Sequence, residues 1–253
     1  MSSAAIEADR ERSYEPATAE SRLLLAEACR IIAHAGLAED ILGHVSLRTA
    51  DGIQIRSRGP RERGLLFTSL DDIQEVRDDV PMPEGYKAPN ELPIHSEIMK
   101  LRPEVKSVAH AHAPHVIAAD LAGLELRPIV GAYNMPAMRM AAFGIKTYPR
   151  SVLINTEELG KEVAEAIGQD PVLILRGHGI VTVGKTVEEA VIRALNIETL
   201  AKMHVLASSC GKVAHEVTES DMALMPDLGS VFNDNFVWQY HQARLELAGL
   251  SLR

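Results

Sequence analysis

A strand-like apolar run leads directly into two histidines in the stretch Val105-Lys106-Ser107-Val108-Ala109-His110-Ala111-His112. Side chains alternate between the two faces of a strand, so His110 and His112 are expected to point the same way. Pro114 then stands at the expected start of a helix, where the N–H group that proline lacks is not needed. The stretch therefore predicts a strand followed by a helix, with two imidazoles at the junction.

The same alternation of strands and helices continues along the chain and predicts an α/β fold. Apolar residues at helical spacing mark helices at 17–37, 92–101, 114–121, 157–167, 187–206 and 231–247. Strand-like runs lie at 41–48, 52–55, 65–68, 105–110, 127–130, 146–148, 172–175 and 180–183. No internal repeat or linker is evident, so we predict a polar, disordered leader over residues 1–16 and one domain over 17–253.

Composition places the chain among ordinary soluble globular proteins. Apolar residues make up 46% and charged residues 24% of its 253 residues. A net charge of −9 argues against a sequence-independent nucleic-acid surface. No apolar run approaches the roughly 20 residues that span a bilayer. The two cysteines, Cys29 and Cys210, suggest no disulfide framework, and Cys29 in a helical apolar pattern is predicted to be a packed thiol. We therefore expect a cytoplasmic protein with no membrane or nucleic-acid partner.

The paired histidines are candidates for holding one divalent metal ion. In a purely structural role, His110 and His112 would each need a separate partner, whereas one ion satisfies both. His178 is a third candidate, because it follows another apolar strand and lies between Gly177 and Gly179, which permit a tight turn. A single buried histidine is more often a hydrogen-bonded core residue, and for His178 that alternative stays open. Zinc, manganese, iron and cobalt all suit such ligands.

Two residues upstream are candidates for acid–base chemistry. Glu91 lies at the start of the helix before the histidine strand. It is either a helix-terminal carboxylate stabilised by the helix dipole or a ligand or proton carrier beside the metal. His95, one turn later, is either a proton donor or a residue that hydrogen-bonds behind Glu91.

These residues belong to a set of motifs that resembles the class II aldolase/adducin family, from about Leu23 to His204. In chain order the motifs are Pro89-Asn90-Glu91, His95, Arg102-Pro103, Val108-Ala109-His110-Ala111-His112 and Gly177-His178-Gly179. The resemblance implies a single three-layer α/β/α domain with a central, mostly antiparallel sheet. It also implies a homotetramer with active sites between subunits, one divalent ion per subunit on His110, His112 and His178, and Glu91 as the acidic catalytic residue.

Departures from the aldolase pattern favour another branch of the family. His44 stands where sugar-phosphate aldolases have an asparagine, and Pro89-Asn90 stands where they have two serines that bind phosphate. The surrounding motifs resemble metal-dependent decarboxylases of hydroxylated aromatic dicarboxylates, including the dihydroxyphthalate group. The resemblance therefore implies a carboxy-lyase without an organic cofactor. The alternatives are an aldolase or epimerase acting on a sugar phosphate and a non-enzymatic, adducin-like interaction module.

An aromatic di-acid needs groups that bind its second carboxylate. The candidates for substrate binding are His44, Arg56, Arg58, Thr68, Ser69 and Asn90. For the arginines, a solvated charged loop is an equally good interpretation. Glu91 or His95 is the predicted donor of the proton that replaces the lost carboxylate.

Three aromatic residues near the C-terminus complete the predictions. Phe236 and Tyr240 are four residues apart and share a helix face, which favours packing in the core. Trp238 points elsewhere and is the better candidate for a subunit contact.

Overall fold

The computed structural model describes residues 14–211, 213, 215–229 and 231–253, and its centre is one seven-stranded sheet. The strands are β1 (His44–Arg48), β2 (Ile53–Arg56), β3 (Ile73–Val76), β4 (Ser107–Ala111), β5 (Thr147–Tyr148), β6 (Val172–Leu175) and β7 (Gly179–Gly184). They lie in the order β3-β2-β1-β4-β7-β6-β5. Only β5 and β6 run parallel, and the other neighbouring pairs are antiparallel. The predicted mostly antiparallel sheet is confirmed.

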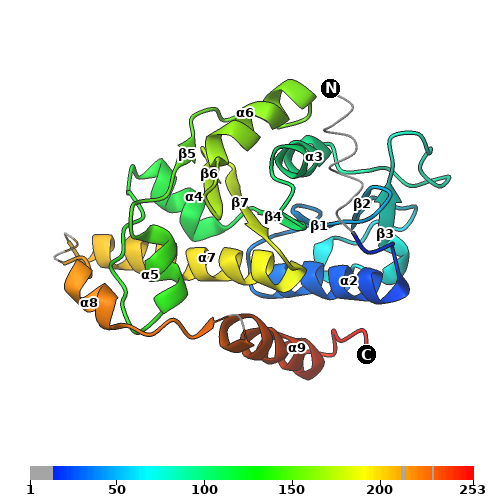
Figure 1. The fold of residues 1–253 in the computed structure, drawn as a ribbon. Helices are drawn as coiled ribbons and strands as arrows, with labels where there is room; N and C mark the ends of the chain where they lie inside the picture. The colour runs from blue at the N-terminus through cyan, green and yellow to red at the C-terminus, as the bar shows by residue number, and fades with distance from the viewer. Residues whose placement is uncertain (1–13, 212, 214, 230) are drawn as a thin grey trace.

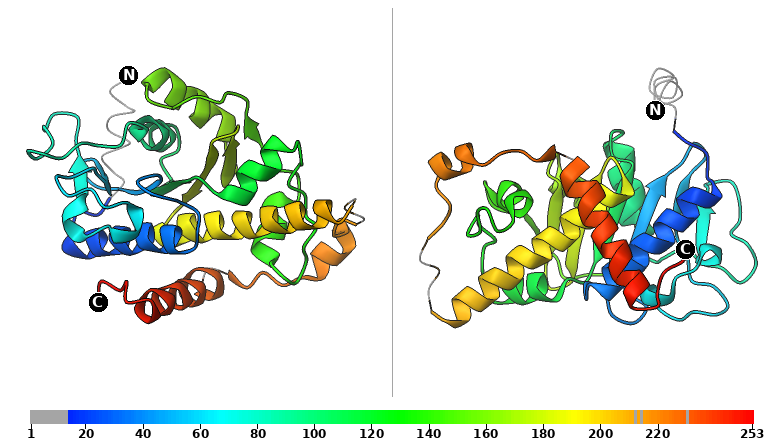
Figure 2. Two further views of the ribbon diagram at one scale, coloured as in Figure 1. Left: turned by 180° about the vertical axis from the view of Figure 1, so that it is seen from behind. Right: turned by 90° about the horizontal axis from the view of Figure 1, so that it is seen from below.

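Helices cover both faces of this sheet, as Figures 1 and 2 show. On one face lie α3 (Leu92–Leu101) and α6 (Glu157–Ile167), which pack on each other. On the other face lie α2 (Ala19–His34) and α7 (Val187–Ser209), with α4 (Pro114–Leu121) against α7. Each face has its own apolar cluster. The chain thus forms the predicted three-layer α/β/α domain.

Three further helices lie outside these layers. They are α5 (Met135–Ala141), α8 (Glu219–Leu224) and α9 (Val237–Leu247). The last of them packs against α2 and α7 and so adds a partial fourth layer (Figure 1).

Local sequence explains where the major helices begin. Thr18, Thr156 and Thr186 precede α2, α6 and α7, and each hydroxyl accepts a hydrogen bond from the backbone N–H group three residues later. Such a cap stabilises a helix by about 1 kcal/mol. Glutamates in the first turns of α6 and α7 add a favourable interaction with the helix dipole.

Several predicted elements are wrong. Residues 65–68 form no strand, because the positive φ of Gly64 leads into a 3-10 turn over Leu65–Phe67. Residues 127–130 are irregular, because a strand needs a neighbouring strand for its hydrogen bonds and the described sheet places none beside them. Strand β3 was not predicted, because polar Gln74 and Glu75 conceal it. The predicted C-terminal helix is confirmed as helical over its whole range, although Val231–Phe236 is a π-helix and α9 begins only at Val237.

The prediction for the C-terminal aromatic residues is also wrong. Trp238 is only 6% exposed and belongs to the core cluster, whereas Phe236 and Tyr240 are 56% and 59% exposed. Helix α9 turns Trp238 and Leu245, seven residues apart, toward α2 and α7. Spacing identified which residues share a face but not which face is buried.

The ends of the chain and the cysteines bear on the remaining predictions. Residues 1–13 of the predicted leader lie outside the described residues, while the Tyr14 hydroxyl donates to the Pro103 carbonyl at 3.2 Å. Cys29 is buried, as predicted, and is unpaired, as is Cys210. Across the described part of the chain, no helix combines the length and apolarity needed to cross a membrane.

Candidate metal centre

Three histidines meet where β4 and β7 approach each other. His110 lies at the end of β4, and the Nε2 atoms of His110 and His112 are 3.1 Å apart. His178 lies in the turn between β6 and β7, and its ring centroid is 4.9 Å from those of both His110 and His112. The structure thus brings together the three predicted metal ligands.

The turn that carries His178 depends on its glycines. Gly177 has a φ of +58°, a conformation that glycine adopts without strain. A Cβ atom on Gly179 would lie 2.3 Å from the carbonyl oxygen of Ala111, so the strands approach this closely only with glycine. The buried carboxylate of Asp120 accepts a hydrogen bond from the Gly177 N–H group at 2.7 Å and fixes the turn from α4.

Glu91 completes the cluster from the opposite side. It is the N-cap residue of α3 and so lies at the positive end of the helix dipole, but its side chain forms no capping hydrogen bond there. Instead its oxygens lie 3.4 Å from His110 Nε2 and 3.5 Å from His178 Nε2. The backbone N–H group of Ile154 also donates to Glu91, at 3.2 Å. A residue with only 6% exposure is thus directed toward the three imidazoles.

These four side chains fit a divalent ion. Their ligand atoms all lie within 4.8 Å of one another. Two nitrogens bound tetrahedrally at about 2.0–2.1 Å would be about 3.3 Å apart, close to the separation of the His110 and His112 Nε2 atoms. The Nδ1 atom of His110 donates to the Ile180 carbonyl at 3.0 Å, which leaves its Nε2 lone pair for the ion. Three imidazoles and a carboxylate suit several transition metals.

The electrostatics of the cluster favour ligands that are free of protons. Burial, and then the charges of His110 and His178, lowers the pKa of His112 to about 4. Burial raises the pKa of Glu91, but contacts with His110 and His178 outweigh it and hold that pKa well below its usual range. At neutral pH His112 is therefore neutral and Glu91 is ionised, which are the states that bind metal.

A second group of polar residues adjoins the cluster. His44 of β1 is the cross-strand partner of His110, so the two side chains share a face, with ring centroids 5.1 Å apart. Its Nδ1 atom lies 2.7 Å from His95 Nε2, and His95 Nδ1 lies 2.6 Å from Ser46 Oγ. Burial lowers the pKa of His95 to about 3. His95 thus lies behind His44 and reaches the cluster through it.

Three other predicted substrate-binding residues have partners elsewhere. Ser46 pairs with Ile55, so the next residue, Arg56, points to the opposite face of the sheet, where it is buried and pairs with Glu62. Thr68 donates to the Leu65 carbonyl, and Ser69 donates to Asp72. The structure does not bring Arg56, Thr68 or Ser69 to the cluster.

The last two predicted substrate-binding residues are exposed. Asn90 directly precedes Glu91 at the cluster. The backbone of Arg58 forms a bridge to Lys87. Their binding roles remain predictions.

The prediction missed two residues that support the site. Ser46 is fully buried beneath His95, and its position two residues after His44 on one strand was the available signal. Asp120 holds the His178 turn across 57 residues of sequence, and no local pattern indicates such a contact.

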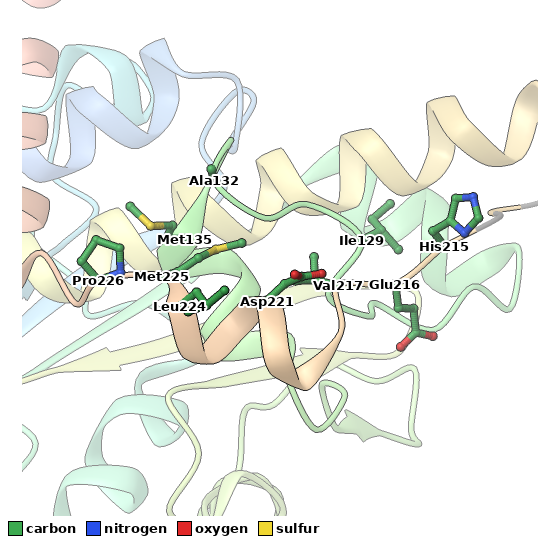
Figure 3. Close-up of a pocket in the computed structure, with 10 residues that line it drawn as sticks. All are labelled: Ile129, Ala132, Met135, His215, Glu216, Val217, Asp221, Leu224, Met225 and Pro226. Atoms are coloured by element: carbon green, nitrogen blue, oxygen red, sulfur yellow. The ribbon is translucent and has the colours of Figure 1, made fainter.

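A separate groove lies between the loop before α5 and the segment around α8 (Figure 3). Its volume is about 640 Å³. It contains no predicted site residue, and its lining is Ile129, Ala132, Met135, His215, Glu216, Val217, Asp221, Leu224, Met225 and Pro226.

Comparison with known proteins agrees with this fold and identifies the family. Residues 24–205 match the model of the class II aldolase and adducin N-terminal domain, and the chain belongs to this family. The 3,4-dihydroxyphthalate decarboxylase of Arthrobacter keyseri is 46% identical over 94% of this chain and 99% of its own. The enzyme of the same name from Terrabacter sp. (strain DBF63) is 43% identical over 90% of this chain and 98% of its own.

A solved structure shows the same architecture at low sequence identity. An aldolase II superfamily protein from Pseudomonas syringae superposes with a TM-score of 0.75 over 97% of this chain and 98% of its own. The two sequences are 22% identical, so this likeness shows the fold alone.

Proposed function

We propose that this protein is a metal-dependent decarboxylase that removes carbon dioxide from 3,4-dihydroxyphthalate. The observation that carries the proposal is the 46% identity to the Arthrobacter keyseri enzyme of that name across nearly the whole of both chains. The cluster of three histidines and Glu91 supports it, because it offers the site that such chemistry needs.

The chain's own residues divide the work of binding and proton transfer. His110, His112 and His178 would hold the ion, and His44, whose ring lies beside that of His110, would face the substrate. A bound divalent ion supplies a Lewis acid for the negative charge that forms on the ring. As the bond between ring and carboxylate breaks, its electron pair stays on the ring carbon, and a proton must form the new C–H bond there. Glu91 is ionised before the reaction, so it would first accept a proton, from water or from the ring hydroxyl, and then deliver it to that carbon from its position beside the ligands.

The metal identity, assembly and location are further parts of the proposal. Zinc, manganese, iron or cobalt, one ion per subunit, matches the donor set. A homotetramer with sites between subunits is supported by large apolar side chains left exposed, namely Leu121, Tyr133 and Phe143 at 74%, 70% and 98%. A cytoplasmic location is supported by the two unpaired thiols. Light scattering coupled to size-exclusion chromatography, with an expected mass of four chains, tests the assembly.

The test of the function is carbon dioxide release from dihydroxyphthalate by protein loaded with each metal in turn. We expect Glu91→Gln to retain the metal but to lower kcat by at least about 100-fold, the usual contribution of a proton-transfer group. His110→Ala should lose both metal and activity. Turnover of fuculose or ribulose phosphate in place of the aromatic di-acid would contradict the proposal.

A further inference from the structure

The nitrogen of His44 that faces the cluster has no hydrogen-bond partner within the described part of the chain. Its nearest acidic neighbour is Glu91, whose Oε2 atom is 3.9 Å from His44 Nε2, beyond hydrogen-bond distance. Glu91 lies closer to His110 and His178. His44 itself is only 7% exposed. A polar atom of a nearly buried side chain that faces a site and has no partner in the chain is available to a ligand there.

The other side of His44 is held by a chain of buried hydrogen bonds. His44 Nδ1 contacts His95 Nε2 at 2.7 Å, and His95 Nδ1 contacts Ser46 Oγ at 2.6 Å. The Ser46 hydroxyl then donates to the Val108 carbonyl at 3.4 Å. Both His95 and Ser46 are fully buried, so water does not interrupt the chain.

The end of the chain sets the direction of its protons. A carbonyl oxygen only accepts, so we assign the Ser46 hydrogen to the Val108 carbonyl, and with this assignment Ser46 Oγ accepts from His95 Nδ1. His95 Nε2 then has only a lone pair, which accepts from His44 Nδ1. The tautomer of an imidazole follows from the bond its other nitrogen makes. His44 Nε2 is therefore left as a hydrogen-bond acceptor.

We propose that His44 Nε2 recognises a hydroxyl group of the substrate by accepting its hydrogen bond, and that Ser46 and His95 are positioning residues that keep the His44 proton on Nδ1. This inference rests on the proposed function, since a hydroxylated aromatic di-acid is the ligand class that brings a ring hydroxyl to this site. An analogue without the hydroxyl leaves a buried acceptor unpaired, and sites of this kind discriminate strongly against such analogues.

The first experiment locates the protons directly, by neutron diffraction from crystals of the zinc-loaded, full-length protein. We expect deuterium on Nδ1 of both His44 and His95 and none on Nε2 of either. Deuterium on His44 Nε2 would overturn the proposal. The measurement uses the unaltered protein and requires no turnover, so it tests this inference even if dihydroxyphthalate proves not to be the substrate.

The second experiment measures binding of 4-hydroxyphthalate and phthalate to zinc-loaded protein by calorimetry. In His44→Phe, which keeps a ring but loses the acceptor, binding of 4-hydroxyphthalate should weaken about tenfold, the effect of one hydrogen bond, while binding of phthalate stays within about twofold. Ser46→Ala and His95→Phe should reduce the same preference.

Thr182→Val is the matched control for these variants. It removes another buried hydroxyl of the sheet, one that donates to the Ala190 carbonyl outside the chain of hydrogen bonds. It should leave the preference for 4-hydroxyphthalate unchanged. If His44→Phe weakened the binding of 4-hydroxyphthalate and of phthalate equally, His44 would have a structural role alone, and the proposal would be overturned.

Discussion

Replacing Glu198 by alanine tests how the start of α4 is held beside the cluster. This helix begins with Pro114, which has no N–H group, after Ala113, which has no side-chain acceptor. Glu198 of α7 supplies the missing cap, although it lies 83 residues after His115 and 82 after Val116. Its carboxylate accepts from the backbone N–H groups of His115 and Val116, at 3.1 Å and 3.2 Å, and contacts His115 Nδ1 at 2.5 Å.

The expected cost follows from the groups that lose this acceptor. Val116 is fully buried, so its unpaired N–H group costs about 1–3 kcal/mol. The N–H group of His115 is nearer to solvent, and water compensates part of its loss. Removing a negative charge from a helix N-terminus adds about 0.3–1 kcal/mol. We expect Glu198→Ala to lower the free energy of unfolding by about 2–4 kcal/mol.

Urea unfolding at a fixed protein concentration, followed by circular dichroism, measures this change. Lys202→Ala, an exposed position on the same helix, is the control and should stay within about 0.5 kcal/mol of the wild type. Glu198→Gln keeps an acceptor oxygen without the charge and should fall between the two. If Glu198→Ala were as stable as Lys202→Ala, a cap supplied by α7 would be refuted.

Three further changes test the metal site and the electrostatics. Asp120→Ala frees the turn at Gly177 that carries His178, and zinc titration should show affinity reduced by about tenfold or more, as for other partners that orient metal ligands. Removing the metal with a chelator should lower the melting temperature, and added zinc should restore it in the wild type but not in His110→Ala. Burial lowers the pKa of His241 in the folded protein to about 4, whereas in the unfolded chain it is about 6.5. Between these two pH values the unfolded chain binds a proton that the folded protein does not. The folded protein therefore loses stability as the pH falls from about 6.5 toward 4. His241→Gln should therefore lose less stability between pH 7 and pH 4.5 in urea unfolding.

Local patterns sufficed to identify the three histidines at the ends of two strand-like runs. Strand alternation alone placed His110 and His112 on one face, and the glycines beside His178 indicated the turn that brings it to them. Arg56 was a candidate only because it is close in sequence to the first loops, and the structure places it on the opposite face of the sheet, paired with Glu62. One residue in the register of β1 against β2 decides the face on which Arg56 lies, and sequence proximity to the first loops carries no information on that register.

The hydrogen-bond chain behind His44 shows what tertiary packing adds. His44 and Ser46 are two residues apart on a strand, so their common face is predictable. Their link is not, because it runs through His95, which α3 places over β1. The same strand register sets His44 opposite His110. The contact with His95 and the pairing with His110 therefore place His44 beside the metal ligands. One ring nitrogen of His44 is hydrogen-bonded to His95, and the other faces the cluster. A substitution at His95 alone should therefore alter ligand preference while leaving His110, His112 and His178 in place.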